Sequence, residues 1–186
     1  MEQDRIPIIM HVCCAGCASH LVSELEKANF LPKLYYYDPY LSHVEYCYLL
    51  TGVQALAQQK ELELILADYN PDEYNQLMVP YTDNKSIKHI ADRSRLERKH
   101  RETVAHLIMD SAARSAIGNG ITYFTSATLC SPHRDHPVLS RVGSEVASQF
   151  DLKFFYSDFR KGYWSGRHYA KQHNLPVSEY CSDQME

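Results

Sequence analysis

The sequence has no run of about 18 apolar residues, the minimum for a membrane-spanning helix, so no membrane partner is expected. It also lacks an excess of basic residues, because 19 Lys and Arg are outnumbered by 23 Asp and Glu, for a formal net charge of -4. This balance excludes a global attraction to nucleic acid, so any RNA contact needs a local basic patch. The acidic segment 1–5 and the short apolar stretch after it do not match a secretory signal, so we expect a cytoplasmic protein.

Internal repeats, low-complexity tracts and linker-like segments are also absent from the sequence. A chain of 186 residues, of which 45% are apolar, is long enough to bury one hydrophobic core and short for two. We therefore expect one domain over residues 1–186.

The most informative stretch is Cys13-Cys14-Ala15-Gly16-Cys17, which holds three of the six cysteines. It follows the apolar, β-branched run 6–12, which is typical of a strand buried on both faces of a parallel sheet. It precedes apolar residues at helical spacing, so the cysteines are expected on a strand-to-helix turn at the carboxyl edge of the sheet, where α/β proteins bind ligands. In a reducing cytosol, such a group of cysteines indicates metal or redox chemistry.

The rest of the chain alternates between strand-like and helix-like segments. Further strands are expected at 34–37, 62–67, 121–125 and 152–156. Helices are expected after the cysteines and over about 42–60, 72–78, 94–117 and 165–173. Another helix is expected between the loop 126–137 and about residue 150. This alternation predicts an α/β fold with a mostly parallel sheet and right-handed crossovers.

Cysteines from separate segments lie close together if the strands at 6–12, 34–37, 121–125 and 152–156 are parallel neighbours. The carboxyl ends of these strands then bring one group of residues to a single edge: Cys13, Cys14, Cys17, Asp38, Cys130 and His133. Three or four thiolates that meet there could hold an iron-sulfur cluster or a zinc ion. The Cys14-x-x-Cys17 spacing also suits a redox disulfide, but the adjacent Cys13 favours a cluster. The alternative is that some of these cysteines are ordinary buried thiols.

Two further residues are expected to be structural. Cys47 shares a predicted helix face with Val44 and Tyr48, which favours a place in the core. His11 lies within a strand, which favours an interior histidine with satisfied hydrogen bonds over a metal ligand.

Two stretches carry the local positive charge that an RNA contact requires. Residues 85–101 contain seven Lys or Arg against two acids, a local charge of +5. Residues 160–167 combine three basic side chains with two aromatic rings that could stack on a base. The alternative for residues 85–101 is a solvated helix face, but their excess of basic residues makes them the best candidate for a contact with the phosphate backbone. The edge-loop histidines His133 and His136 fit substrate binding or a surface turn about equally well.

Several separated segments, in the same order and over nearly the whole chain, resemble the QueH family of epoxyqueuosine reductases. They are 11–17, 36–39 with 45–46, 124–129, 131–136, 158–162 and 180–181. The resemblance implies a single-domain, Rossmann-like, three-layer α/β sandwich of the HUP nucleotide-binding type, with about five strands. It also implies a [4Fe-4S] cluster beside an additional iron ion. The implied reaction reduces epoxyqueuosine at the wobble base of a tRNA with a GUN anticodon, using a separate electron donor.

The same resemblance implies roles for residues of this chain. The implied ligands of the cluster and of the metal are Cys13, Cys14, Cys17 and Cys181. Cys130 is not expected from the family pattern and is a further candidate ligand because of its place at the edge of the sheet. For the reductase reaction, the candidate catalytic groups are Asp38, Cys181 and Asp183. One of the two aspartates, or the second metal, would polarise the epoxide oxygen. The candidate substrate or RNA contacts within the matching segments are His133, Arg134, Arg160 and Lys161. Arg98 and Arg101 of the basic stretch 85–101 are further candidates for RNA contacts.

This chain departs from the family pattern at two places. The family's Cys-x-x-Cys falls on Ser94-Arg95-Leu96-Glu97, and its terminal Tyr-Cys-Gly-Cys falls on Tyr180-Cys181-Ser182-Asp183. Two metal ligands and one redox cysteine of the family are therefore missing. Cys130, or Glu97 and Asp183 as oxygen ligands, could complete the site. Alternatively, three sulfurs of the first loop hold a cluster that has one open iron.

Other functions remain as alternatives on the same scaffold. One is an iron-sulfur enzyme that acts on another modified nucleobase, such as a thiolated base. Another is a non-catalytic RNA-binding paralogue. An ATP pyrophosphatase of the same fold class is disfavoured, because cysteines replace its glycine- and serine-rich phosphate loop.

Overall fold

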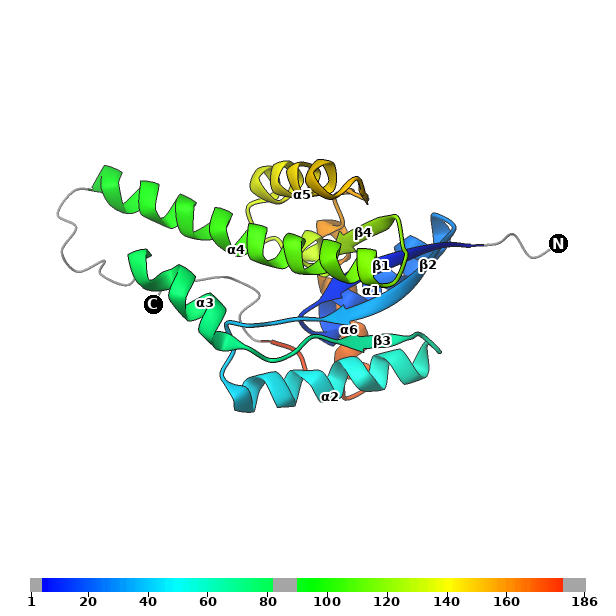
Figure 1. The fold of residues 1–186 in the computed structure, drawn as a ribbon. Coiled ribbons are helices and arrows are strands. Elements are labelled where there is room, and N and C mark those ends of the chain that lie inside the picture. Colours follow the sequence, from blue (N-terminus) through cyan, green and yellow to red (C-terminus); the bar gives the residue numbers. More distant parts are fainter. Residues whose placement is uncertain (1–4, 82–89, 179–186) are drawn as a thin grey trace.

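The computed structural model describes residues 5–81 and 90–178 (Figure 1). In this part of the chain, five strands form a single sheet in the order β3-β2-β1-β4-β5, and every neighbouring pair is parallel. The strands are β1 (Ile6–Val12), β2 (Phe30–Tyr36), β3 (Leu64–Leu66), β4 (Tyr123–Ser126) and β5 (Lys153–Phe154). The predicted α/β fold with a parallel sheet is therefore confirmed.

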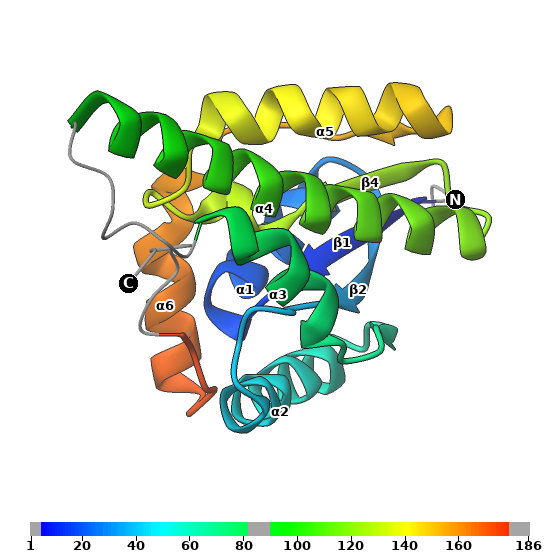
Figure 2. The same cartoon turned by 60° about the vertical axis from the view of Figure 1, so that its left-hand side comes forward.

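Helices cover both faces of the sheet, which gives the expected three layers. One face is covered by α4 (Ile90–Gly118) and α5 (His136–Phe150), and the other by α1 (Ala15–Lys27), with α2 (His43–Gln59) and α6 (Tyr163–Gln172) packed beside it (Figure 2). The short helix α3 (Pro71–Met78) lies against α4. Three 3₁₀ turns complete these elements: η1 (Val79–Tyr81), η3 (Ala127–Cys130) and η4 (Arg160–Gly162). No helix in the described part of the chain has the length and apolar character to cross a membrane.

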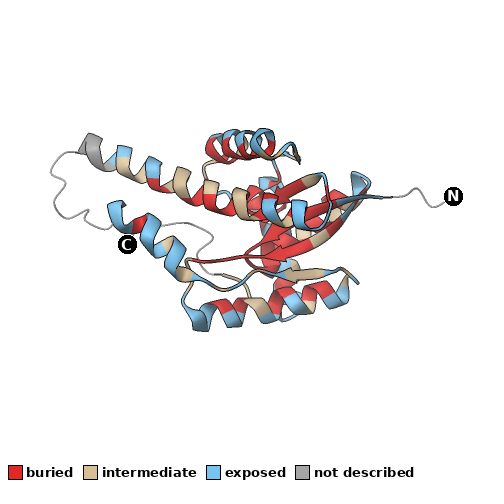
Figure 3. Ribbon diagram, in the orientation of Figure 1, coloured by how far each residue is buried: buried red, intermediate tan, exposed pale blue. Residues whose placement is uncertain are grey.

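The strand β1 occupies the centre of the sheet because its sequence is apolar on both faces. Ile8, Ile9, Met10 and Val12 are all fully buried, as expected for a central parallel strand between two helical layers. Figure 3 shows the buried residues along the central strands and on the inward faces of the helices. The residues that follow β1 therefore emerge at the carboxyl edge directly from the core.

Local sequence signals fix the starts of several helices. Before α2, the Ser42 hydroxyl accepts a hydrogen bond from the Glu45 N–H at 3.3 Å, and the Glu45 carboxylate accepts one from the Ser42 N–H at 3.3 Å, which forms a capping box. Before α5, the Asp135 carboxylate accepts a hydrogen bond from the Val138 N–H at 3.2 Å. The predicted start of α2 is thus confirmed, whereas α4 begins at Ile90, earlier than the predicted residue 94.

The predicted inner face of α2 is wrong. Cys47 is exposed, and Val44 and Tyr48 are 78% and 60% exposed. The buried stripe of α2 consists of Tyr46, Leu49, Val53 and Leu56. Both stripes repeat every three to four residues, so the spacing alone does not decide which stripe faces the sheet. Cys47 is therefore a surface thiol and not a core residue.

Candidate functional site

The carboxyl ends of the central strands bring several predicted site residues to one edge of the sheet. Cys13 and Cys14 follow β1, Asp38 follows β2, and Cys130 ends the turn η3 directly after β4. The predicted strand neighbours are confirmed, because β2, β1, β4 and β5 are consecutive in the sheet. Loops that follow parallel strands gather at one edge, which is the usual ligand-binding edge of α/β sheets.

His11 ties three of these strand ends together. Its side chain is fully buried, with Nε2 at 2.8 Å from the Tyr37 carbonyl oxygen and Nδ1 at 2.8 Å from the Ser126 hydroxyl. A carbonyl oxygen only accepts hydrogen bonds, so Nε2 carries the proton and Nδ1 accepts from Ser126. Burial lowers the pKa of His11 to about 4, against a smaller opposite effect of the hydrogen bond to Tyr37. His11 is therefore a neutral interior histidine, as predicted.

Asp38 is a buried carboxyl group with an unused acceptor atom. It is 2% exposed, and its Oδ1 accepts no hydrogen bond from the described residues. Burial raises the pKa of Asp38 well above the usual value. The Arg134 guanidinium lowers this pKa and the Cys14 thiol raises it, and a hydrogen bond from the Tyr40 hydroxyl lowers it. Because burial dominates, Asp38 keeps its proton at pH values where an exposed aspartate is ionised.

Arg134 and Tyr40 form the polar surroundings of Asp38. Arg134 Nη2 donates a hydrogen bond to the Tyr40 hydroxyl oxygen at 2.9 Å, and the guanidinium carbon lies 5.7 Å from the centre of the Tyr40 ring. Arg134 is only 8% exposed. A substrate that contacts Arg134, as the sequence predicts, must therefore enter the edge beside Asp38.

The cysteines of the first loop lie in two apolar environments. Cys13 and Cys14 pack with Leu49 of α2 and with Leu41. Cys17 belongs to the main hydrophobic core, which also contains the buried thiol of Cys130. All four thiols are buried at or near the predicted edge.

Metal-ligand geometry is not complete within the described part of the chain. Over residues 5–81 and 90–178, no group of three or more His, Cys, Asp or Glu side chains is placed to hold a metal ion. The thiol-rich donor set has the chemistry that iron prefers, but these side chains alone do not enclose an ion. The predicted ligand Cys181 and the predicted acid Asp183 lie outside the described residues. The ligand set therefore stays a prediction.

The two edge-loop histidines have different surroundings. His133 is exposed, and its ring centre lies 5.7 Å from the Tyr163 ring in an edge-to-face arrangement. His136 is buried at the start of α5, where its Nε2 donates a hydrogen bond to the Ser131 carbonyl oxygen at 3.3 Å. Burial lowers the pKa of His136. His136 is thus a structural residue, whereas His133 faces solvent where a substrate can reach it.

The basic candidates differ in how strongly they are already paired. Asp158 holds Arg160 through both carboxylate oxygens, and Arg101 Nε lies 3.8 Å from Asp135 Oδ2. Three candidates are exposed on the surface: Arg98, Arg160 and Lys161. Two other basic residues of the predicted patch lie outside the described residues: Lys85 and Lys88. The predicted RNA contacts stay predictions.

The sequence profile of one family, described as Epoxyqueuosine reductase QueH, matches residues 8–182. The chain belongs to the QueH family. Its sequence is 27% identical over 175 residues to the Epoxyqueuosine reductase QueH of Dehalococcoides mccartyi, and the alignment covers 94% of this chain and 88% of the relative. It is 25% identical over 177 residues to the Thermotoga maritima protein of the same name, and this alignment covers 94% of this chain and 86% of the relative. For the Streptococcus pyogenes protein of that name the identity is 26% over 192 residues, with 97% and 70% covered. The family predicted from the motifs is confirmed.

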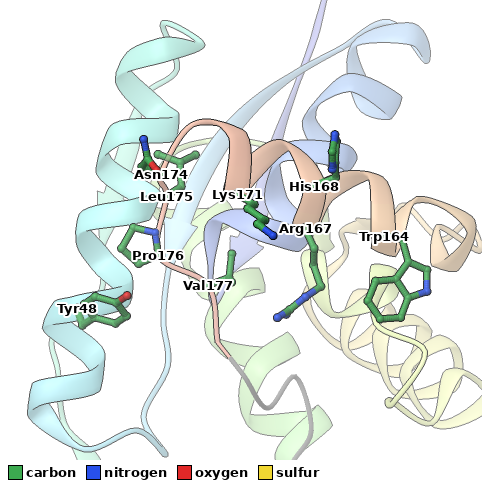
Figure 4. Close-up of a pocket in the computed structure, with 9 residues that line it drawn as sticks. All are labelled: Tyr48, Trp164, Arg167, His168, Lys171, Asn174, Leu175, Pro176 and Val177. Atoms are coloured by element: carbon green, nitrogen blue, oxygen red, sulfur yellow. The ribbon is translucent and has the colours of Figure 1, made fainter.

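This QueH-family chain also has a groove that the sequence did not reveal. It has a volume of about 1000 Å³, and we call it the α2–α6 groove (Figure 4). Its lining residues are Tyr48, Trp164, Arg167, His168, Lys171, Asn174, Leu175, Pro176 and Val177. Trp164 and Arg167 lie within the basic stretch noted in the sequence, but Tyr48 comes from a distant helix. No local pattern links these segments, so only the fold brings them together.

Proposed function

We propose that this QueH-family chain reduces the epoxide of epoxyqueuosine in tRNA to the alkene of queuosine. The relatives named above are epoxyqueuosine reductases. The observation that carries the proposal is the position of Asp38, a buried carboxyl with an unused Oδ1, next to the cysteine loop at the carboxyl edge. This pairing of an acid with thiols suits a reductive step that also needs protons.

The reaction requires two electrons and two protons for each epoxide. Both carbon–oxygen bonds break, a carbon–carbon double bond forms, and the oxygen leaves as water. In this proposal Asp38 donates a proton to the epoxide oxygen as the first carbon–oxygen bond breaks. The Tyr40 hydroxyl and the Arg134 guanidinium hold the carboxyl group in place, and His11 fixes the backbone just before it.

We also propose that Cys13, Cys14 and Cys17 are ligands of a [4Fe-4S] cluster, with Cys130 and Cys181 as further candidates and an additional iron ion nearby. The support is their thiol chemistry and their place at the edge of the sheet. When bound, such a cluster would pass electrons from an external donor to the substrate. The described side chains do not enclose an ion, so we derive no catalytic step through it.

A single-turnover assay tests the proposed reaction. Protein that has been reconstituted with iron and sulfide and then reduced is mixed with tRNA that carries epoxyqueuosine, and the nucleosides are identified by mass spectrometry. We expect queuosine from the wild type and none from Cys14→Ala. Cys47→Ala is the matched control, because it removes an exposed thiol on α2 and should leave the yield unchanged.

Iron and sulfide analysis of the same samples separates the two parts of the proposal. Protein that binds iron and sulfide but forms no queuosine would contradict the reductase function. Protein that stays free of iron after reconstitution and still forms queuosine would contradict the cluster.

A further inference from the structure

The α2–α6 groove has exposed aromatic rings on opposite sides. Tyr48 and Trp164 are 60% and 73% exposed, although both are large apolar side chains. Figure 4 shows them on either side of the space into which the Arg167 and Lys171 side chains project. Exposed rings at the walls of a groove are suited to stacking on a planar ligand such as a nucleobase.

The groove is positively charged although the whole chain carries a net charge of -4. Among the described residues that line it, Arg167 and Lys171 carry a positive charge and none is Asp or Glu. Arg167 Nη1 donates a hydrogen bond to the Ser178 carbonyl oxygen at 2.9 Å, and its guanidinium carbon lies 5.6 Å from the centre of the Tyr163 ring, so the side chain is held in place. Lys171 lies one turn further along α6, on the same face of the helix. Two cations in this arrangement can bind neighbouring phosphates of a nucleic-acid backbone.

The groove also adjoins the cysteine loop. A Cβ atom placed on Gly16 would lie 3.2 Å from Val177 Cγ1 and 3.6 Å from Arg167 Cγ, and both residues line the groove. The same Cβ position is 3.8 Å from Cys14 Sγ. A ligand in the groove would therefore lie beside the turn that carries the thiols.

We propose that the α2–α6 groove binds a single-stranded segment of RNA, with phosphates on Arg167 and Lys171 and bases stacked on Trp164 and Tyr48. This inference rests on the reductase function proposed above, because it gives the tRNA substrate a binding surface next to the cysteine loop. Cations interleaved with exposed rings are the usual features of proteins that bind single-stranded nucleic acid. The groove includes Trp164 and Arg167 of the stretch 160–167 that the sequence predicted as an RNA contact, and it does not include the predicted contacts Arg98 and Lys161.

An acidic electron-donor protein would also be attracted by the positive charge. Electron-transfer complexes, however, use small interfaces. A hollow of about 1000 Å³ with a ring on each side fits a splayed nucleotide strand better than a folded protein surface. The observations thus favour RNA.

Trp164 is the single tryptophan of the chain, so its fluorescence reports directly on the groove. We expect unmodified tRNA transcript with a GUN anticodon to quench this fluorescence when it binds. Lys171→Glu should weaken binding by about tenfold and lower the slope of log Kd against log salt by about one phosphate contact. Tyr48→Ala should also weaken binding by about tenfold, because it removes a stacking surface.

Lys153→Glu is the matched control for charge. Lys153 is exposed at the start of β5, away from the carboxyl edge. The Lys153→Glu variant should therefore bind tRNA with the same affinity as the wild type. Binding without a change in Trp164 fluorescence, or equal weakening by the two Lys→Glu variants, would overturn the proposal. Quenching by an acidic ferredoxin-type protein but not by tRNA would overturn it too, and would assign the groove to an electron donor. These measurements need neither the cluster nor the epoxide, so they stand apart from the single-turnover result.

Discussion

The Nε2 atom of His11 lies 2.8 Å from the carbonyl oxygen of Tyr37, so a side chain in β1 holds the backbone at the end of β2. The other ring nitrogen contacts Ser126 at the end of β4 at 2.8 Å. Asp38 follows Tyr37 directly, and Cys13 lies two residues after His11. One neutral imidazole therefore sets the relative positions of the loops that carry the proposed acid and the thiols.

His11→Phe should unfold at lower denaturant concentration than the wild type. The substitution keeps a ring but removes the donor to the buried Tyr37 carbonyl and the acceptor for the Ser126 hydroxyl, which keeps only its contacts with Thr128, at a cost of about 2–5 kcal/mol. Urea denaturation followed by circular dichroism measures this loss. His168→Ala, which removes an exposed imidazole on α6, is the control and should change the unfolding free energy by less than about 0.5 kcal/mol. Equal stability of His11→Phe and the wild type would contradict the coupling.

Gly166→Ala should destabilise the contact between α1 and α6. A Cβ atom at Gly166 would lie 2.1 Å from the Gly16 carbonyl oxygen, so the two helices would have to move apart. We expect a loss of about 2–4 kcal/mol in the free energy of unfolding. Gly118→Ala is the control, since nothing lies within 4 Å of its Cβ position. If both variants unfold together with the wild type, the close helix packing does not hold in solution.

The stability of the protein should fall as the pH is lowered below about 6.5, in part because of His136. Burial lowers the pKa of His136 in the folded state, so the unfolded chain binds a proton there before the folded protein does. Acidification therefore favours unfolding, by up to about 1.4 kcal/mol per pH unit from this group. His136→Gln keeps a donor for the Ser131 carbonyl but cannot titrate. Thermal melts between pH 7.5 and 5 should show a weaker pH dependence in this variant, and an unchanged dependence would contradict the argument.

The sequence was sufficient for the features that depend on burial along one element. The continuous apolar run of β1 predicted a central parallel strand, and the position of His11 within it predicted an interior histidine. The prediction of which side of α2 is buried was wrong, because Val44, Cys47 and Tyr48 repeat at the same spacing as the residues that are buried. Only packing against the sheet distinguishes two stripes of similar apolar character.

The candidate site was predictable only in part, because its members come from separate elements. The order of the strands brings Cys13, Cys14 and Asp38 to the same edge of the sheet. The alternation of strands and helices in the sequence predicted this arrangement. The α2–α6 groove had no such signal, since it depends on how Tyr48 and Trp164 are placed by two helices distant in sequence. The partners of Asp38 were likewise hidden, because the hydrogen bond between Arg134 and Tyr40 joins two loops far apart in the chain.

Asp38→Asn should slow the proposed reduction strongly while leaving the fold intact. The amide has the shape of the carboxyl group but cannot donate an acidic proton to the epoxide oxygen, and general acids of this kind contribute about 10²–10⁴ to a rate. Asparagine also removes an ionisable group whose charged form is disfavoured by burial, so the variant should be at least as stable as the wild type at neutral pH. Single-turnover rates of queuosine formation measure the effect, with Asp72→Asn on the exposed start of α3 as the control. If Asp38→Asn reacts at the wild-type rate, the proton comes from another group, because the asparagine amide cannot donate it.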